Sequence, residues 1–303
     1  MATTDAVRGR LSELHEAVWE LAAIALALQD PASTDPQRRA SAEAVLVETG
    51  FMENSSGTPR PAAGVAEVMG TDAGRLASQA STAILQTAGL LSGAKGWQDQ
   101  DDQALLAQGR ASAQGAPLFK AFAMDGLGDL LSGPSPAMLD VGVGVAALAV
   151  AYCEAFPGLS VVGLDVSSAA LRLAGRTVDE AGMSDRVELR HRDVAELDDR
   201  HRYCLAWLPA PFVPPSALHQ GLPRIVTALV PGGWLVVGHG KFHEGRRSNA
   251  ISRFQTTIFG GTALDDDQAQ AMLRDAGLEK VFTFPTPPGT PGITVGRRAA
   301  RAD

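Results

Sequence analysis

Apolar side chains in the first third of the chain recur at the spacing of α-helices. Between residues 6 and 29 they return every three or four positions, which places one apolar stripe on a helix. Similar patterns span residues 36–48, 72–91, 101–114 and 117–131. Asp35 precedes Pro36 and is placed to cap the second helix. Residues 54–59, Asn-Ser-Ser-Gly-Thr-Pro, have the composition of a loop. Since β-branched alternation is scarce here, this third of the chain is expected to be all-α.

The pattern changes after residues 132–136, Ser-Gly-Pro-Ser-Pro, which have the composition of a linker. Short apolar runs follow at 138–141, 160–164, 187–190, 204–208, 234–238, 281–284 and 293–296. Helical patterns fill the gaps at 145–155, 168–182, 216–229 and 265–276. Strands joined by helices form a mostly parallel sheet that is covered on both faces. The sequence therefore predicts an α/β fold, with a doubly wound, mostly parallel seven-stranded Rossmann-like sheet in residues 134–303. Residues 1–133 are the N-terminal all-α extension, expected to serve as a lid or a dimerisation region.

Composition narrows the choice of partners and of compartment. The 303 residues include 34 acidic and 26 basic side chains, a net charge of −8, which argues against nucleic acid or an anionic membrane as the main partner. No apolar run approaches the roughly 18 residues of a membrane span, and no secretory signal is recognisable at the start. Two cysteines, Cys153 and Cys204, fit a reducing cytoplasm and cannot form a four-ligand zinc site alone. A cytoplasmic protein of bacterial origin is expected, the origin from the abundance of alanine and arginine.

The first predicted strand of the sheet runs into a glycine-containing turn, residues 139–146, Leu-Asp-Val-Gly-Val-Gly-Val-Ala. Glycines let a backbone turn tightly and approach a ligand, and the next helix offers free N–H groups. The turn by itself also fits a dinucleotide fingerprint or a plain strand-to-helix connection. Asp140 is expected to point its carboxylate into the crevice, where a nicotinamide site usually has an apolar residue. Asp165 ends the next strand, where it can accept both hydroxyls of a ribose.

In combination, these features resemble the class I, Rossmann-like methyltransferases that depend on S-adenosylmethionine (SAM). The glycine turn, Asp165, the segment 186–194 that contains Asp193, and the Pro-Gly-Gly of residues 231–233 follow in the order of that family. The Pro-Gly-Gly is expected to stop a helix before the fifth strand. The resemblance covers about residues 136–298 and departs from the family at Ala146, where a third glycine is common. It implies a SAM-dependent methyltransferase of the small-molecule type.

The resemblance also implies a role for each cofactor-binding candidate. Gly142 and Gly144 border the methionine part of SAM, and Asp140 attracts its amino group. Asp165 holds the ribose. The remaining candidates lie against the adenine or elsewhere along the cofactor, and they are Val166, Asp193, Val194, Trp207 and Arg110. Three alternatives stay open: Asp165 as a simple strand-end acid, Asp193 as a solvated helix cap, and Arg110, expected to cap the cofactor carboxylate, as a solvent-facing side chain.

The end of the fourth strand of the sheet, residues 206–215, faces the transferred methyl group in this family. It lacks the Asn-Pro-Pro-Tyr-like motif of methyltransferases that act on nucleobases or glutamine, and the base histidine of plant-type O-methyltransferases. Trp207 and Phe212 form an apolar wall suited to an aromatic or terpenoid-like acceptor, although ordinary packing of a proline-rich loop is an equal alternative. Phe119 and Phe122, just ahead of the linker, are further substrate-binding candidates.

Candidates for proton removal follow the fifth strand. His239 and His243 lie there with Lys241, Glu244 and two arginines. Histidine suits deprotonation of a hydroxyl near neutral pH, and His243 is favoured because His239 adjoins the strand and can be packed. A solvated charged loop is the alternative, and no metal site is expected.

We therefore expect a SAM-dependent methyltransferase that acts on a small, largely apolar organic acceptor of secondary metabolism and forms a homodimer. A SAM-binding protein that catalyses a non-methylating step, such as a cyclisation, is the first alternative. An NAD(P)-dependent oxidoreductase and a cofactor-free binding module are less favoured alternatives.

Overall fold

The computed structural model divides the chain into two compact units, Met1–Ser92 and Gly93–Asp303. It describes residues 4–28, 35–55, 58–63, 65, 73–91, 93, 96–113, 115, 126–240, 245–286 and 291–300. The division lies ahead of the linker at 132–136, so the helix of residues 102–113 belongs to the second unit.

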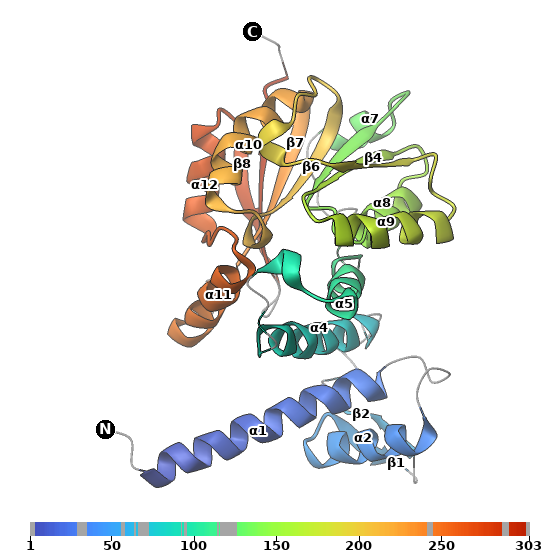
Figure 1. Ribbon diagram of the computed structural model, residues 1–303, viewed down its shortest axis with the longest axis vertical. Coiled ribbons are helices and arrows are strands. Elements are labelled where there is room, and N and C mark those ends of the chain that lie inside the picture. The colour runs from blue at the N-terminus through green and yellow to red at the C-terminus, as the bar shows by residue number, and fades with distance from the viewer. Residues whose placement is uncertain are drawn as a thin grey trace. The chain divides into compact units, whose positions relative to one another are not determined.

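The first unit contains three described helices and a hairpin (Figure 1). The helices are α1 (Thr4–Ala27), α2 (Pro36–Glu48) and α4 (Ala73–Leu91). Its small core joins Ala23 and Ala27 of α1 to Leu46 of α2. Asp35 caps α2 by accepting the backbone N–H of Arg38 at 3.0 Å, as predicted.

The hairpin corrects the expectation of an all-α segment. Strands β1 (Met52–Ser55) and β2 (Thr58–Pro61) pair antiparallel where a loop was expected. Two prolines obscured β2 in the sequence, Pro59 and Pro61. They are tolerated because residues two apart direct their backbone nitrogens the same way. Ala62 donates its N–H to the carbonyl of Phe51, the residue before the partner strand. The backbone nitrogens of Pro59 and Pro61, which alternate with that of Ala62, therefore face away from the partner strand and need no acceptor there.

The second unit is built on a seven-stranded sheet of order β5-β4-β3-β6-β7-β9-β8. β3, β4, β5, β6 and β7 are parallel, and β9 runs antiparallel to both β7 and β8. The strands are β3 (Ala137–Val141), β4 (Ser160–Asp165), β5 (Val187–His191), β6 (Tyr203–Pro209), β7 (Leu229–His239), β8 (Glu279–Phe284) and β9 (Gly292–Arg297). This confirms the predicted fold class. Chain order reverses direction between β3 and β6, the position at which such sheets bind ligands.

Helices cover both faces of this sheet (Figure 1). The first face packs on α7 (Leu127–Leu131), α8 (Ala147–Ala155) and α9 (Ser168–Glu180), and the second on α10 (Pro215–Ala228) and α12 (Asp266–Asp275). Successive residues of a strand alternate between the two. Met138 therefore lies in the core of the first face and Leu139 in that of the second. The other elements are η2 (Trp97–Asp99), α5 (Asp102–Ala113), η3 (Val194–Glu196), η4 (Ala210–Phe212) and α11 (Arg246–Phe259).

Two details of the second unit differ from the sequence-based expectation. α10 ends at Ala228, and the Pro-Gly-Gly of residues 231–233 lies inside β7, where Gly232 has a φ of +82°. It therefore bends a strand and stops no helix. α11 spans Arg246–Phe259, where the sequence patterns predicted no helix, and the charged loop considered as an alternative reached only to Arg247. Of the helix expected at 117–131, residues 117–125 lie outside the described part.

Candidate functional site

Three predicted site residues share one face of the sheet, at its carboxyl edge. Asp140 is two residues after Met138, and Asp165 is four residues after Val161, so strand alternation directs both toward the α8 face. Trp207 is the Cα partner of Asp140 across β3 and β6. It packs over Gly238 of β7, where a side chain would overlap its ring. The register of three strands thus places two carboxylates and an indole around the point where the chain order reverses.

The turn after β3 adopts the backbone geometry that its glycines permit. Gly142 and Gly144 have φ values of +66° and +57°, in the left-handed region that glycine adopts readily. A Cβ at Gly144 would have the Gly142 carbonyl at 4.0 Å as its nearest neighbour, so the space beside the turn is open. Ala146 takes a φ of +61° and precedes α8 without a side-chain cap. The first N–H groups of α8 therefore have no capping side chain.

Asp165 locks the glycine turn to the end of β4. Its Oδ2 accepts the N–H of Gly144 at 2.8 Å, and its Oδ1 accepts the N–H of Ser167 at 2.8 Å. Burial raises the pKa of Asp165, and the backbone hydrogen bonds oppose that rise. Backbone N–H groups of Gly144, Ser167 and Val166 take up part of its acceptor capacity, and a carboxylate with about four lone-pair sites can still accept from a diol.

Asp140 is buried more deeply, at 1% exposure. Within the part of the chain that the structure describes, its Oδ2 has no hydrogen-bond partner. Burial, and then the charge of Asp165, raise the pKa of Asp140 to about 8. An unsatisfied buried carboxyl oxygen is costly, so Asp140 Oδ2 is suited to accept a hydrogen bond or ion pair from a ligand.

The predicted adenine contacts lie at the ends of β4 and β5. Val166 is 54% exposed although it is apolar, and its carbonyl contacts His191 Nε2 at 2.9 Å. Asp193 caps η3 by accepting the N–H of Ala195 at 2.8 Å, so the cap alternative describes part of its role. Val194 is buried and packs against Gly221 of α10.

Helix α5 covers the glycine turn from outside the sheet. Leu105 packs in one cluster with Val145 of the turn and Leu173 of α9. The backbones approach closely, because a Cβ at Gly109 would overlap the Val145 side chain. Arg110 is exposed in the last turn of α5, so its contact with the cofactor carboxylate stays a prediction.

An aromatic cluster lies beyond the carboxyl ends of β6 and β7. Phe212 of η4 stacks on Phe259 of α11, with ring centroids 5.0 Å apart. Trp97 of η2 contacts both rings, at 4.8 Å and 5.6 Å. Phe212 was a predicted wall residue, whereas Trp97 and Phe259 were missed. No local motif marks Trp97, and Phe259 lies in the unexpected helix.

His239 occupies the opposite face from Asp140. It follows Leu235 and Val237, which lie in the core beside α12, and it is 1% exposed. Its Nε2 is 2.8 Å from Thr294 Oγ1, and its Nδ1 is 3.3 Å from the Gly240 carbonyl. A carbonyl oxygen only accepts, so the second contact places a proton on Nδ1. The protein thus engages both ring nitrogens, and the catalytic role of His239 stays a prediction.

Three predicted residues lie outside the described part of the chain: Phe119, Phe122 and His243. Their roles in substrate binding and proton removal stay predictions. Among the described residues, no group of three histidine, cysteine or acidic side chains is placed to hold a metal ion. In the same residues, no helix is long and apolar enough to cross a membrane.

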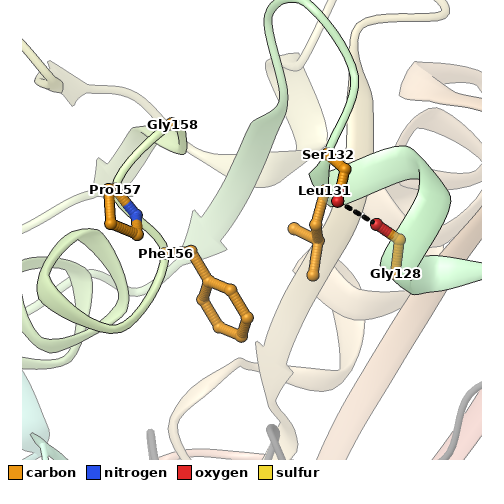
Figure 2. A pocket seen from close by; sticks show the side chains of 6 residues that line it. All are labelled: Gly128, Leu131, Ser132, Phe156, Pro157 and Gly158. Carbon is orange, nitrogen blue, oxygen red and sulfur yellow. Dashed lines mark hydrogen bonds between the residues drawn. The ribbon is translucent and has the colours of Figure 1, made fainter.

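A hollow of about 270 Å³ lies at the other end of the sheet. Figure 2 shows Leu131, the last residue of α7, and Phe156, just after α8, both directed into this space. Ser132 donates its hydroxyl to the Gly128 carbonyl at 2.8 Å. Gly158 belongs to the connection that enters β4, so the hollow adjoins the amino ends of the strands. It is remote from both carboxylates and takes no part in the site.

The glycine turn and the two acids match a known family. Residues 138–233 match the family described as "Methyltransferase domain". This part of the chain is a class I methyltransferase domain. The release factor glutamine methyltransferase of Rhodopirellula baltica is 33% identical over 112 residues, or 37% of this chain and 38% of that protein. The chain thus spans less than half the length of this curated relative.

Solved structures extend the likeness in fold to the whole chain. An O-methyltransferase family protein from Burkholderia thailandensis is 16% identical with a TM-score of 0.65, and the match covers 100% of both chains. Human N-acetylserotonin methyltransferase, solved with SAM, is 14% identical with a TM-score of 0.55 over 99% of this chain and 100% of that one. These matches confirm SAM as the cofactor predicted for the domain.

The residues of the methyltransferase domain fit this cofactor. The buried Asp140 oxygen offers an acceptor to a cationic amino group, and the cofactor carries one. The open space beside Gly144 admits a chain that passes close to the backbone. Asp165 is held so that its free lone pairs can take a ribose diol, and the exposed Val166 offers an apolar surface to a base.

Proposed function

We propose that the protein is a SAM-dependent methyltransferase whose acceptor is a small, largely apolar organic molecule of secondary metabolism. The observation that carries the proposal is the pairing of Asp165 with the glycine turn beside the buried Asp140. A dinucleotide site usually has an apolar residue where Asp140 lies, at the end of the first strand of the sheet. The domain match and the full-length likeness in fold support the same activity.

The aromatic cluster supports a flat, apolar acceptor. Trp97, Phe212 and Phe259 are half-buried and come from three elements around the ends of β6 and β7. Aromatic faces favour stacking with planar groups. The relative from Rhodopirellula baltica is named as acting on a release factor. Here residues 209–212, at the end of β6 and just after it, are Pro-Ala-Pro-Phe and lack an amide-binding asparagine.

The chain acts mainly by holding the two reactants in line. When bound, SAM supplies an electrophilic methyl group. Asp165 holds the ribose and Asp140 the amino group, which fixes the cofactor along the sheet edge. The apolar wall excludes water and orients the acceptor atom toward the methyl group. Such alignment can contribute roughly 7–11 kcal/mol to lowering a barrier. His243 is the proposed base where the acceptor is a hydroxyl.

A homodimer formed through α1 is part of the proposal. The apolar residues Val7, Leu11, Leu14 and Val18 are spaced by four, three and four positions and are 44–62% exposed. A continuous exposed stripe of this kind is a typical interaction surface. We also propose a cytoplasmic location, which the two buried free cysteines support.

Incubation with methyl-labelled SAM and a panel of phenols, naphthols and indoleamines tests the activity. Mass spectrometry should show an acceptor heavier by one CH₂, with S-adenosylhomocysteine formed in equal amount. An isomerised product of unchanged mass would instead favour the cyclisation. Binding of NADH but not of SAM would contradict the proposal.

A further inference from the structure

The two carboxylates of the site differ in how they are satisfied. Each Asp165 oxygen accepts a backbone N–H at 2.8 Å, and these hydrogen bonds favour its anion and oppose the rise in pKa that burial causes. Asp140 is 1% exposed, and its Oδ2 has no hydrogen-bond partner among the described residues. The backbone therefore offsets part of the cost of burying a charge at the end of β4, and Asp140 on β3 lacks that support at its Oδ2.

The surroundings of Asp140 favour its neutral form. From β4 it faces the carboxylate of Asp165, and from β6 the uncharged Trp207. From α8 it faces Tyr152, whose pKa is raised first by burial and then by Asp140 itself. Among the described residues, no cation contributes to its pKa of about 8. Asp140 thus carries a proton at neutral pH until a positive charge arrives.

We propose that Asp140 exchanges this proton for the ammonium group of an incoming ligand, and so selects ligands that carry a cationic amino acid moiety. This inference rests on the proposed function, since SAM is the ligand. The O–H bond of the carboxylic acid breaks, its electron pair stays on the carboxylate, and the proton leaves to solvent. The ammonium of the ligand then forms an ion pair with the new carboxylate.

The exchange fixes the direction of the pH dependence. Below about pH 8 the proton must leave before the ion pair forms, so SAM affinity rises with pH, by at most about tenfold per pH unit. Above that pH the carboxylate is already ionised and the rise ends. 5′-Methylthioadenosine keeps the adenosine, has a neutral thioether in place of the sulfonium and lacks the amino acid moiety, so its affinity should not depend on this proton.

Titration calorimetry in two buffers of different ionisation enthalpy measures the protons released. At about pH 7, SAM should release close to one proton and 5′-methylthioadenosine close to none. Asp140→Asn should abolish the release and flatten the pH dependence of SAM affinity. Asp165→Asn removes the neighbouring charge that raises the pKa of Asp140, so its release should shrink at pH 7 and persist at lower pH.

The controls separate this inference from the proposed function. SAM binding without proton release would overturn the inference and leave the methyltransferase proposal intact. Absence of SAM binding at every pH would contradict the proposed function. Should Asp140→Asn fail to fold, NMR of ¹³Cγ-labelled aspartate in the wild-type protein still decides the matter. One carboxyl should titrate far above the others without ligand and be ionised at pH 7 with SAM; a carboxyl that is already ionised without ligand would overturn the inference.

Discussion

The N–H of Gly144 donates to Asp165 Oδ2 across two neighbouring strand ends, at 2.8 Å. This hydrogen bond makes the glycine turn and the end of β4 one rigid unit. A residue that is expected to bind ribose therefore also sets the shape of the turn that borders the methionine part. Loss of its charge affects the cofactor in two ways.

Asp165→Ala should weaken SAM binding at least about tenfold, because each charge-assisted hydrogen bond is worth about 1.5–3 kcal/mol. Asp165→Asn keeps an oxygen for Gly144 and loses the negative charge, so its affinity should be intermediate. Calorimetry measures both, and circular dichroism checks the fold. Wild-type affinity in the alanine variant would contradict the ribose assignment.

Gly109→Ala should destabilise the protein by about 1–3 kcal/mol, since the new methyl overlaps Val145 in a packed contact. Gly175→Ala is the matched control: it is also inside a helix, α9, and a Cβ there meets nothing within 4 Å. That variant should gain about 0.5–1 kcal/mol. Urea unfolding compares the two. Recovery in Gly109→Ala/Val145→Ala would show that the overlap causes the loss, and equal effects of both glycine substitutions would argue against the close approach.

Removal of residues 1–92 should leave SAM binding largely intact, whereas removal of residues 1–133 should weaken it. The shorter deletion keeps α5, which buries Leu105 against Val145 and Leu173. The longer one removes Leu105 and exposes Val145 and Leu173 beside the glycine turn. SAM affinity and light scattering of the two fragments provide the test. Equal affinity and solubility would mean that α5 does not support the turn.

His243→Ala should lower turnover of a hydroxyl acceptor by about 10²-fold or more and leave SAM affinity unchanged. His239→Ala should mainly reduce stability, because its ring is buried and fills the space beside Gly292. Kinetics and thermal unfolding together separate the roles. Turnover of His243→Ala within about threefold of wild type would favour catalysis by proximity alone.

Leu11→Glu/Val18→Glu should convert the dimer to a monomer, since both side chains lie on the exposed stripe of α1. Ser12→Glu, on a different side of the same helix, should leave the assembly unchanged. Analytical ultracentrifugation measures the three proteins. A wild-type monomer at micromolar concentration would contradict the dimer proposal.

The sequence predicted the sheet and the positions of the two acids at its strand ends well, because both depend on local patterns. Asp140 and Asp165 each end a buried apolar run, and parallel strands bring such ends together. α11 was not expected because Gly245, the residue before its start at Arg246, provides no side-chain cap, and the helix is rich in serine, threonine and asparagine. The contact of Trp97 with Phe259 joins distant residues, and no periodicity reports such a contact. The orientation of His239, in contrast, follows from counting alternate residues along β7 from Leu235.

The shared face of Asp140 and Asp165 restricts how the gene can change length. Insertion of one codon at the start of β3 would rotate the Asp140 carboxylate to the α12 face of the sheet. It would also move Leu139 from that face to the α8 face. An insertion in β4 would have the same effect on Asp165. Substitutions in these strands can be absorbed by repacking, but a single-residue insertion or deletion cannot. Related genes that keep the activity should therefore vary in length in the connections at the amino ends of the strands, such as 182–186, and hardly at all in the strands that lead to the two acids.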